Sequence, residues 1–560
     1  MKNNYLLALS SAFLLWLAWP PTPFTSFLLL IALVPLLIAV ENIIYSNAFK
    51  KKSLKVFKIA FLCFFIWNTA CIYWIFNSLN AVMPVWTAAI ISIIPFGLGS
   101  LLMTISFWLY YQMRKVSRRW WSYAALVCFW IGYEYLHQSW DLAFPWMNLG
   151  NGFARDHYLV QWYEYTGVYG GTYWVLMSNI LLFETYLAYK SAKAKKDLEI
   201  KNYKLVQLLA RFALHIAVPV LLSFYMYYSN SEKINPSNVV VVQPNIDPYA
   251  KFGTMPVFKQ IEVLIRLSDS LGKANTEYFI WPETAISKDT DEESIRQESN
   301  YLDVKRFLNK YKNGNVITGI ESYAIYKSAK TSTARLDERS GNYFDVFNAA
   351  IQIENSPKIQ FYHKSKLVPG VEQIPFSGSL SFIKPFFQDF GGSAGSYGKQ
   401  AHPSVFYSQN GIGAAPVICY ESIWGEYVSD YVQQGAQFIT IITNDAWWGN
   451  TSGKDQHLQY AKLRAIETRR WVARSANTGI SAFINQRGDI VQQSGWWQTT
   501  ALSADINLND DQTFYVKHKD YIAFVGCLGS FGFGLFLLYV LFVDKKQNGL
   551  KHQDSKIPVV

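Results

Sequence analysis

The chain alternates long apolar stretches with polar loops before residue 229, mixes both kinds of residue from there to about residue 520, and ends with one more apolar stretch. A helix that crosses a bilayer needs about 20 mostly apolar residues. Eight stretches meet this need and predict transmembrane helices: 4–19, 24–41, 56–76, 86–112, 120–137, 168–189, 205–228 and 521–543. The run Pro20-Pro21-Thr22-Pro23 predicts a tight hairpin between the first two. No small-residue cleavage site follows the first stretch, which we therefore expect to be retained.

The segment 229–520 has the pattern of one α/β domain. Short apolar runs typical of buried strands recur at 239–242, 278–281, 316–320, 346–353, 415–418, 438–443 and 480–485. Apolar residues at helical spacing predict a helix from Val257 to Leu271 and a second amphipathic helix over 457–474. The acidic run 289–298 is typical of a solvated surface excursion. Strands that alternate with helices predict a layered sheet-and-helix fold.

Composition agrees with a hybrid of a membrane part and a water-soluble part. Of the 560 residues 51% are hydrophobic and only 16% are charged, against about 25% in a typical soluble protein. This excludes intrinsic disorder and disfavours an ordinary cytosolic enzyme. The mean hydropathy of +0.06 is low for a protein that lies wholly in the membrane.

The formal net charge of +11 is a topology signal. The segments 42–55, 113–119, 190–204 and 544–560, together with Lys2, hold 19 Lys or Arg and four acidic residues, whereas the alternate loops hold one basic residue, Arg155. Basic residues concentrate in cytoplasmic loops of membrane proteins. We therefore expect cytoplasmic termini and four parts: a seven-helix membrane domain (1–228), an exported domain (229–520), the eighth helix (521–543) and a tail (544–560). Basic residues placed this way leave no reason to expect nucleic-acid binding.

Cysteine usage draws attention to one residue. Four of the five cysteines lie inside predicted membrane helices, and Cys419 alone lies in the exported domain. A lone exported cysteine cannot pair within its domain, so it is either buried and inert or a nucleophile. Cys419 follows the apolar run 415–418, and catalytic groups in α/β folds favour the end of a strand.

A reactive thiol needs a base or a cation nearby, and two further segments offer them. Glu283 follows Trp281-Pro282 at the end of the strand at 278–281. Lys364 lies beyond the strand at 346–353 and has Lys366 as a competitor two residues away. Taken alone, the glutamate is typical of a turn and the lysine of a solvated surface, so only the set of three is informative.

These residues resemble the Glu-Lys-Cys triad of the nitrilase superfamily in order and in local sequence. Trp281-Pro282-Glu283, Lys364-Ser365-Lys366-Leu367 and Ile418-Cys419-Tyr420-Glu421 are similar to its three motifs. With eight apolar stretches, the chain resembles the bacterial apolipoprotein N-acyltransferase family over nearly its whole length. Further matching pieces are Phe144-Pro145-Trp146, 242–246, Leu367-Val368-Pro369 with Glu372, 443–449, 456–458 and 464–467.

The resemblance implies an αββα sandwich that carries the active site. It implies transfer of a fatty acyl chain from a phospholipid to the N-terminal amine of a diacylglyceryl-cysteine on an apolipoprotein, in two steps through a Cys419 thioester. Glu283 would be the general base and acid, and Lys364 would stabilise the oxyanion. Glu372, Tyr420 and Glu421 match residues that support the site. The protein would then lie in the bacterial inner membrane with its catalytic domain in the periplasm.

Aromatic residues are candidates for lipid contact. We name Trp146, Trp424, Trp447 and Trp448, since tryptophan favours the membrane interface.

The sequence departs from the family's pattern at two places. Gly370-Val371 stands where the family often has Phe-Gly, and Phe252 stands where some members have a tryptophan that handles substrate.

Two other functions stay open at this stage. A membrane-tethered amidase could use the same triad to hydrolyse a C–N bond, and a lipid or peptide receptor would not need Cys419. The exported domain has no zinc, CxxC or nucleotide-loop motif, and His457 is the only other ligand-type residue beside a motif. We therefore expect no metal and no cofactor.

Overall fold

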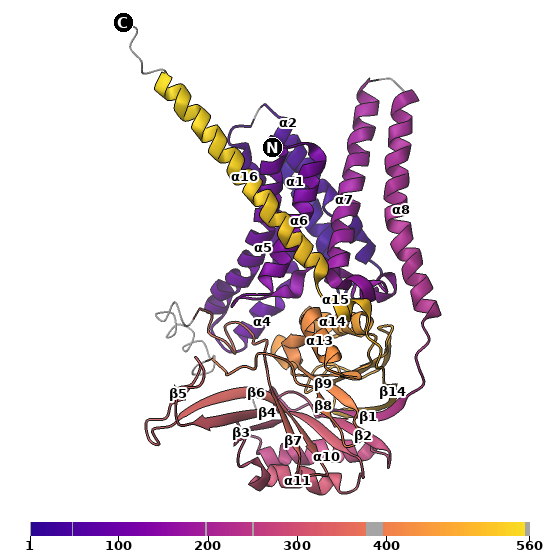
Figure 1. Ribbon diagram of the computed structural model, residues 1–560, viewed down its shortest axis with the longest axis vertical. Helices are drawn as coiled ribbons and strands as arrows, with labels where there is room; N and C mark the ends of the chain where they lie inside the picture. Colours follow the sequence, from indigo (N-terminus) through magenta and orange to yellow (C-terminus); the bar gives the residue numbers. More distant parts are fainter. Residues whose placement is uncertain are drawn as a thin grey trace.

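A bundle of long helices lies against an α/β sandwich in the computed structural model (Figure 1). The structure describes residues 2–47, 49–195, 199–248, 251, 253–376 and 396–554. The chain builds most of the bundle first, then the sandwich, and returns to the bundle with its last helix.

Each predicted membrane stretch coincides with helical structure. The corresponding elements are α1 (Lys2–Leu17), η1 (Ser26–Leu30) with α2 (Val34–Tyr45), α3 (Lys52–Ile72), α5 (Val85–Val116), α6 (Arg119–His137), α7 (Tyr163–Lys195), α8 (Glu199–Ser229) and α16 (Tyr521–Asp554). The short α4 (Trp74–Asn80) follows α3 after a break at Tyr73.

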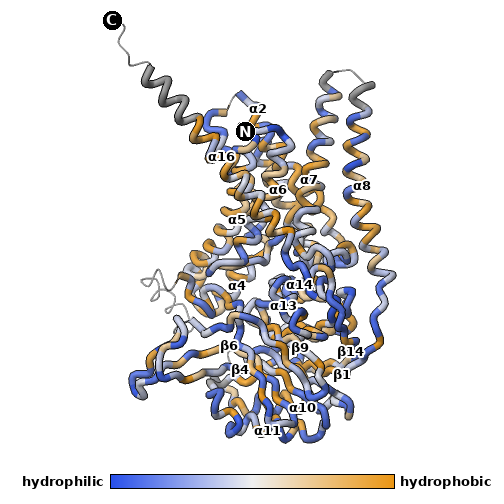
Figure 2. Tube along the Cα trace, viewed as in Figure 1, coloured by the Kyte–Doolittle hydropathy of each residue, from blue (hydrophilic) through white to orange (hydrophobic). Residues whose placement is uncertain are grey.

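Hydrophobic residues dominate this helical part (Figure 2). Among the described residues five helical segments are long and apolar enough to cross a bilayer: 26–45, 52–72, 85–116, 203–229 and 521–543. Length and composition thus establish a multi-pass bundle, and the count of eight spans stays a prediction. The apolar faces of α8 and α16 are largely exposed, as suits contact with lipid.

The sandwich consists of two mixed sheets. The first has the order β14-β1-β2-β4-β6-β5, with β3 on β4 and β7 on β6, and the second has the order β13-β12-β11-β10-β9-β8. The strands of the first sheet are β1 (Pro236–Gln243), β2 (Thr276–Ile280), β3 (Ile286–Asp291), β4 (Asn315–Tyr326), β5 (Arg335–Leu336), β6 (Tyr343–Glu354), β7 (Ile359–His363) and β14 (Thr500–Asn507). Those of the second are β8 (Phe406–Tyr407), β9 (Gly413–Ile418), β10 (Phe438–Thr443), β11 (Val472–Ala476), β12 (Ala482–Ile484) and β13 (Ile490–Gln493).

Helices cover the outer face of each sheet. The apolar sides of α10 (Val257–Leu271) and α11 (Ser299–Leu308) pack on the first sheet, where they form a separate core. The second sheet carries α13 (Gly425–Gln433) and α14 (Ser452–Thr468) on the side that faces the bundle (Figure 1). Between the sheets, the rings of Tyr278 and Phe438 lie 5.2 Å apart. The expected αββα sandwich is confirmed.

Several sequence-based boundaries were wrong. The predicted helix 457–474 begins earlier, at Ser452, and ends at Thr468, because Arg469 adopts a left-handed φ of 50° and β11 follows. This helix is also buried on all sides from Gln456 onward, so that part has no solvated face. The acidic run 289–298 is only partly a surface excursion, since β3 extends into it and Ile295 is buried.

One buried side chain, Gln456 of α14, joins the sandwich to the bundle. Its Nε2 donates to the carbonyl oxygens of Pro20, at 2.9 Å, and Cys71, at 3.0 Å. Its Oε1 accepts from the indole nitrogens of Trp74, at 3.2 Å, and Trp146, at 2.7 Å. All four hydrogen-bonding positions of the amide are therefore used, and they reach three separate segments of the bundle and one loop.

Replacing this amide tests the junction. Gln456→Leu leaves two buried indole N–H groups and two carbonyls without their partner, and each unpaired group costs about 1–3 kcal/mol. We expect the midpoint of thermal unfolding in detergent to fall by several degrees. Gln434→Leu, at an exposed position on the same sandwich, is the control. Equal midpoints for the two variants would contradict the junction.

Candidate active site

Three chain segments place the predicted residues together at one end of the sandwich. Glu283 follows β2 after the Trp281-Pro282 turn, and Cys419 begins the 3-10 helix η7 (Cys419–Ile423) directly after β9. Lys364 follows β7, a strand that the sequence pattern did not reveal, and not the strand at 346–353. The first sheet thus contributes Glu283 and Lys364, and the second contributes Cys419.

The Lys364 ammonium lies between two carboxylates. Its Nζ is 3.1 Å from Oε1 of Glu283 and 2.8 Å from Oε1 of Glu372. The Lys364 side chain is 1% exposed, and the two carboxylates are nearly as buried. Burial alone would lower the pKa of Lys364, but the charges of Glu283 and Glu372 outweigh it and raise that pKa well above its ordinary value. Lys364 is therefore a fixed cation.

Asn348 completes this cluster and was missed by sequence reasoning. Its Nδ2 donates to Oε1 of Glu283 and to Oε1 of Glu372, both at 2.9 Å, while its backbone oxygen accepts from the Lys364 N–H. The sequence did carry a signal for Asn348. It is a polar residue within the apolar run 346–353, and this run forms the buried part of β6. A polar side chain in a buried strand needs partners, and here the partners are the candidate catalytic carboxylates.

The backbone around Glu283 is held tightly. Thr284 has a φ of 46°, and a Cβ added to Gly319 of β4 would lie 2.6 Å from the Cα of Glu283. The Lys251 ammonium donates to the Glu283 carbonyl oxygen at 2.9 Å and to Oγ1 of Thr284 at 2.7 Å. Burial lowers the pKa of Lys251 to about 7. The close contact with glycine and the lysine clamp fix where the carboxylate of Glu283 points.

Cys419 lies on a strained turn with a φ of 49°. Its backbone oxygen accepts from Oγ of Ser422 at 2.8 Å and lies 3.2 Å from Nε2 of His457. Asp445 lies behind the imidazole, 3.1 Å from Nδ1, and Arg474 pairs with Asp445 at 2.7 Å. Nε2 of His457 also lies 2.9 Å from Oγ of Ser422, so the serine and the imidazole meet at the same carbonyl oxygen. This buried row holds the turn of the nucleophile.

The Cys419 side chain rests as a thiol. Burial raises its pKa well above the ordinary value, and the charge of Glu283 raises it further, whereas Lys364 acts in the opposite direction. Lys364 lowers the pKa of this thiol, but desolvation exceeds the attraction of the ammonium. Deprotonation needs a base, and Glu283 is the negative group that raises the pKa of Cys419 most.

Tyr420 and Glu421 fasten the nucleophile's turn to its surroundings. Glu421 accepts from the backbone N–H groups of Ile418, at 2.9 Å, and Ser365, at 2.7 Å, and from the hydroxyl of Tyr362. It thereby ties the cysteine turn to the lysine segment. The hydroxyl of Tyr420 donates to the carbonyl oxygen of Ala143, in the loop that leads into the bundle, at 3.0 Å.

The candidate lipid-contact residues occupy different environments. Trp146 is fully buried, where it donates to Gln456 and packs against Trp74 and Trp448. Trp424 is buried and donates to the carbonyl oxygen of Gln138, whereas Trp448 is half-buried.

Trp447 is 38% exposed and is therefore the candidate with the most accessible surface. Phe252 lies outside the described residues. Within the described ranges no group of three or more His, Cys, Asp or Glu side chains is arranged to hold a metal ion.

Comparison with known proteins assigns both halves of the chain. Residues 11–181 match the family described as apolipoprotein N-acyltransferase N-terminal domain, and residues 238–514 match the family described as carbon-nitrogen hydrolase. The chain is 29% identical over 547 residues to an apolipoprotein N-acyltransferase of Chlorobaculum tepidum, which covers 95% of this chain and 96% of the relative. It is 27% identical over 545 residues to the protein of the same name from Geobacter metallireducens, with 94% of each covered.

Two of the solved structures that resemble the chain cover about half of it. Nit3 of Saccharomyces cerevisiae, a member of branch 10 of the nitrilase superfamily, is 15% identical and covers 50% of this chain and 93% of its own, with a TM-score of 0.35. An amidase from Nesterenkonia sp. is 14% identical and covers 52% of this chain and 97% of its own, with a TM-score of 0.33.

The electrostatics of Cys419 predict an unusual effect of Glu283→Gln. Removing this negative charge lowers the thiol pKa and raises the thiolate fraction, by up to about tenfold for one pKa unit. We expect faster alkylation of Cys419 by iodoacetamide at mildly alkaline pH, followed by peptide mass spectrometry. Glu262→Gln, an exposed carboxylate on α10, should leave the rate unchanged. A slower rate for Glu283→Gln would contradict this account of the resting site.

Proposed function

The chain belongs to the apolipoprotein N-acyltransferase family, and from this premise we propose that it transfers a fatty acyl chain from a phospholipid to the N-terminal amine of a diacylglyceryl-cysteine on an apolipoprotein. The observation that carries the proposal is the buried pair of Glu283 and Lys364 beside Cys419, in a domain fixed to a bundle of apolar helices. An acyl ester and an amine are substrates that a thiol with a base and a cation can join.

The first half-reaction forms a thioester. Glu283 takes the proton of the Cys419 thiol, and the sulfur attacks the ester carbonyl of the phospholipid. The Lys364 ammonium stabilises the oxyanion of the tetrahedral intermediate. The intermediate then breaks its bond to the glycerol oxygen, which receives the proton held by Glu283. A lysophospholipid leaves, and the acyl chain stays on Cys419.

The second half-reaction uses the same groups in reverse order. The neutral amine of the lipidated cysteine attacks the thioester carbonyl, and Glu283 takes the amine proton. Collapse of the second tetrahedral intermediate forms the amide, and the departing sulfur of Cys419 regains a proton from Glu283. One base thus serves both halves, as expected when the two steps share one reacting carbon.

The hydrogen bonds of Glu283 support this role. Lys364 and Asn348 both contact Oε1. Among the described residues none donates to Oε2, so one oxygen is held while the other is left for a proton. Lys366, the competing lysine, lies with its ammonium 5.9 Å from the centre of the Trp424 ring and 5.2 Å from that of Tyr427, and not at the carboxylates.

Glu372 and the residues of the Cys419 turn position the reacting groups and do not themselves react. Glu372 accepts the second hydrogen bond from the Lys364 ammonium and is itself held by the Val368 N–H at 2.8 Å. We assign it to orienting Lys364. Tyr420 and Glu421 are assigned to holding the turn of the nucleophile, and the exposed Trp447 to contact with substrate lipid.

We place the protein in the bacterial inner membrane with residues 229–520 in the periplasm and both termini in the cytoplasm. The supporting observation is that the basic segments around the start of α3 and between α5 and α6, with the C-terminal end of α7 and the N-terminal end of α8, lie at the end of the bundle away from the sandwich (Figure 1). The four parts then keep the boundaries 1–228, 229–520, 521–543 and 544–560. Both lipid substrates can keep their chains in the bilayer while their polar ends reach Cys419.

A membrane-tethered amidase with the same triad is the weaker alternative, because it leaves the match of residues 11–181 unexplained.

A covalent intermediate is the direct test. Intact mass spectrometry of the detergent-purified protein after incubation with phospholipid should show an added mass of one acyl chain. Hydroxylamine should remove the adduct, because it cleaves thioesters, and Cys419→Ala should not form it. Unchanged lipoprotein acylation by Cys419→Ala would overturn the mechanism.

The two lysines offer a matched comparison. Lys364→Met removes the oxyanion stabiliser, so we expect kcat to fall by about 10²–10³-fold with little change in the KM for phospholipid. Lys366→Met removes a cation that contacts only aromatic rings in the described structure, and kcat should stay within a few-fold of the wild type. The reverse order of effects would assign the oxyanion to Lys366.

A further inference from the structure

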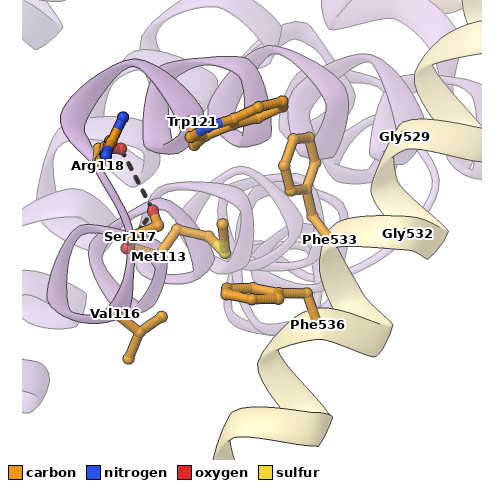
Figure 3. Close-up of a pocket in the computed structure, with 9 residues that line it drawn as sticks. All are labelled: Met113, Val116, Ser117, Arg118, Trp121, Gly529, Gly532, Phe533 and Phe536. Carbon is orange, nitrogen blue, oxygen red and sulfur yellow. Dashed lines mark hydrogen bonds between the residues drawn. The ribbon is translucent and has the colours of Figure 1, made fainter.

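A groove opens at the end of the bundle that lies farthest from Cys419. It encloses about 600 Å³ between the C-terminal end of α5, the N-terminal end of α6 and the middle of α16 (Figure 3). Five apolar side chains line it: Met113, Val116, Trp121, Phe533 and Phe536. Its distance from the candidate active site separates it from the binding of the reacting lipids.

Glycines of α16 decide where this helix touches α6 and where it leaves room for the groove. Closer to the sandwich the two helices touch through glycine, since a Cβ on Gly526 would lie 2.5 Å from Ile131 and one on Gly529 would lie 2.4 Å from Sγ of Cys128. One turn later, at Gly532, an added Cβ would meet no atom within 4 Å. Figure 1 shows α16 crossing the bundle obliquely, so its C-terminal end diverges from the other helices.

The lining has the shape and chemistry to hold a hydrocarbon chain. Trp121 and Phe533 face each other with ring centroids 6.4 Å apart, and Phe536 lies farther along the same side of α16 (Figure 3). Trp121 is 60% exposed and Phe536 is 39% exposed. Large apolar side chains with this exposure at the end of a membrane helix contact lipid rather than water.

Arg118 is the basic residue among those that line the groove. Of the other basic residues nearby, Arg114 and Arg119 are paired with Glu41 at 3.1 and 2.8 Å, and the Lys115 ammonium lies 5.6 Å from the centre of the Tyr111 ring. Arg118 lines the groove, is exposed, and has no ion pair with any acid in the described ranges. A guanidinium offers several donors in a fork that matches phosphate oxygens.

We propose that this groove binds one phospholipid with an anionic headgroup, with an acyl chain along Trp121, Phe533 and Phe536 and its phosphate on Arg118. The absence of an acidic partner for Arg118 favours a lipid with net negative charge over a zwitterionic one. The bound lipid fills the gap between α6 and α16, and it is neither acyl donor nor acceptor. This site needs only that the helices lie in a membrane, so it does not rest on the acyl-transfer chemistry.

Native mass spectrometry of the full-length protein in detergent tests the site. The probes are phosphatidylglycerol and phosphatidylcholine with the same acyl chains, and the quantity is the affinity of the first binding event. We expect phosphatidylglycerol to bind at least about fivefold more tightly, since a basic residue near anionic lipid contributes about that factor. Arg118→Gln should remove this preference.

Two glycines of α16 give a matched control. Gly532→Leu fills the groove and should weaken the binding of both lipids. Gly534 also faces open space but does not line the groove, so Gly534→Leu should behave as the wild type. Equal affinities of the wild type for the two lipids, or unchanged binding by Gly532→Leu, would overturn the proposal. All three variants should retain lipoprotein N-acylation, which separates failure of this site from failure of the proposed reaction.

Discussion

The candidate active site depends on one buried ammonium. Glu283 and Glu372 come from different segments of the chain, and two carboxylates this close would repel each other in a site with little water. The Lys364 ammonium contacts both, and Asn348 adds a hydrogen bond to each, so four side chains form one hydrogen-bonded unit. Removing one partner of such a buried pair typically costs about 3–5 kcal/mol, because a charge is left without compensation. The arrangement therefore fixes the position of the base as firmly as that of the cation.

The membrane bundle is held to the same unit through the nucleophile's own turn. Tyr420 and Trp424 lie immediately after Cys419 in the chain and donate to carbonyl oxygens of the loop that follows α6. On the opposite side of that loop, Trp146 donates to Gln456 of the sandwich. The thiol consequently keeps one position relative to the helices, and lipids that approach from the bilayer meet it at one depth.

Sequence reasoning located the groups that terminate strands, and the resemblance added Glu372, Tyr420 and Glu421 as support, but no role was predicted for Asn348 or for the side chain of Gln456. Glu283 and Cys419 are visible because an apolar run stops beside each of them. Asn348 and Gln456 lie inside buried elements, and their partners come from residues 24 to 436 positions away, so only the folded chain reveals them. The limits of the helix at 452–468 were wrong for the same reason, since a helix buried on all sides lacks the periodicity that marks a solvated one. The resemblance to a family supplied what local patterns could not.

The proposed reaction leaves the net charge of the site unchanged at every step. In the resting state, two carboxylates and one ammonium leave one net negative charge, and the thiol is neutral. When Glu283 takes the thiol proton, the negative charge moves to sulfur, and attack on the ester moves it to the oxyanion beside Lys364. When the leaving oxygen takes the proton from Glu283, the negative charge returns to the carboxylate. The net charge of a buried site is thus constant at every step, and the enzyme avoids the large cost of creating a new charge away from water. The raised pKa of Cys419 contributes to this constancy, because it keeps the sulfur neutral until a carbonyl is present to receive the charge.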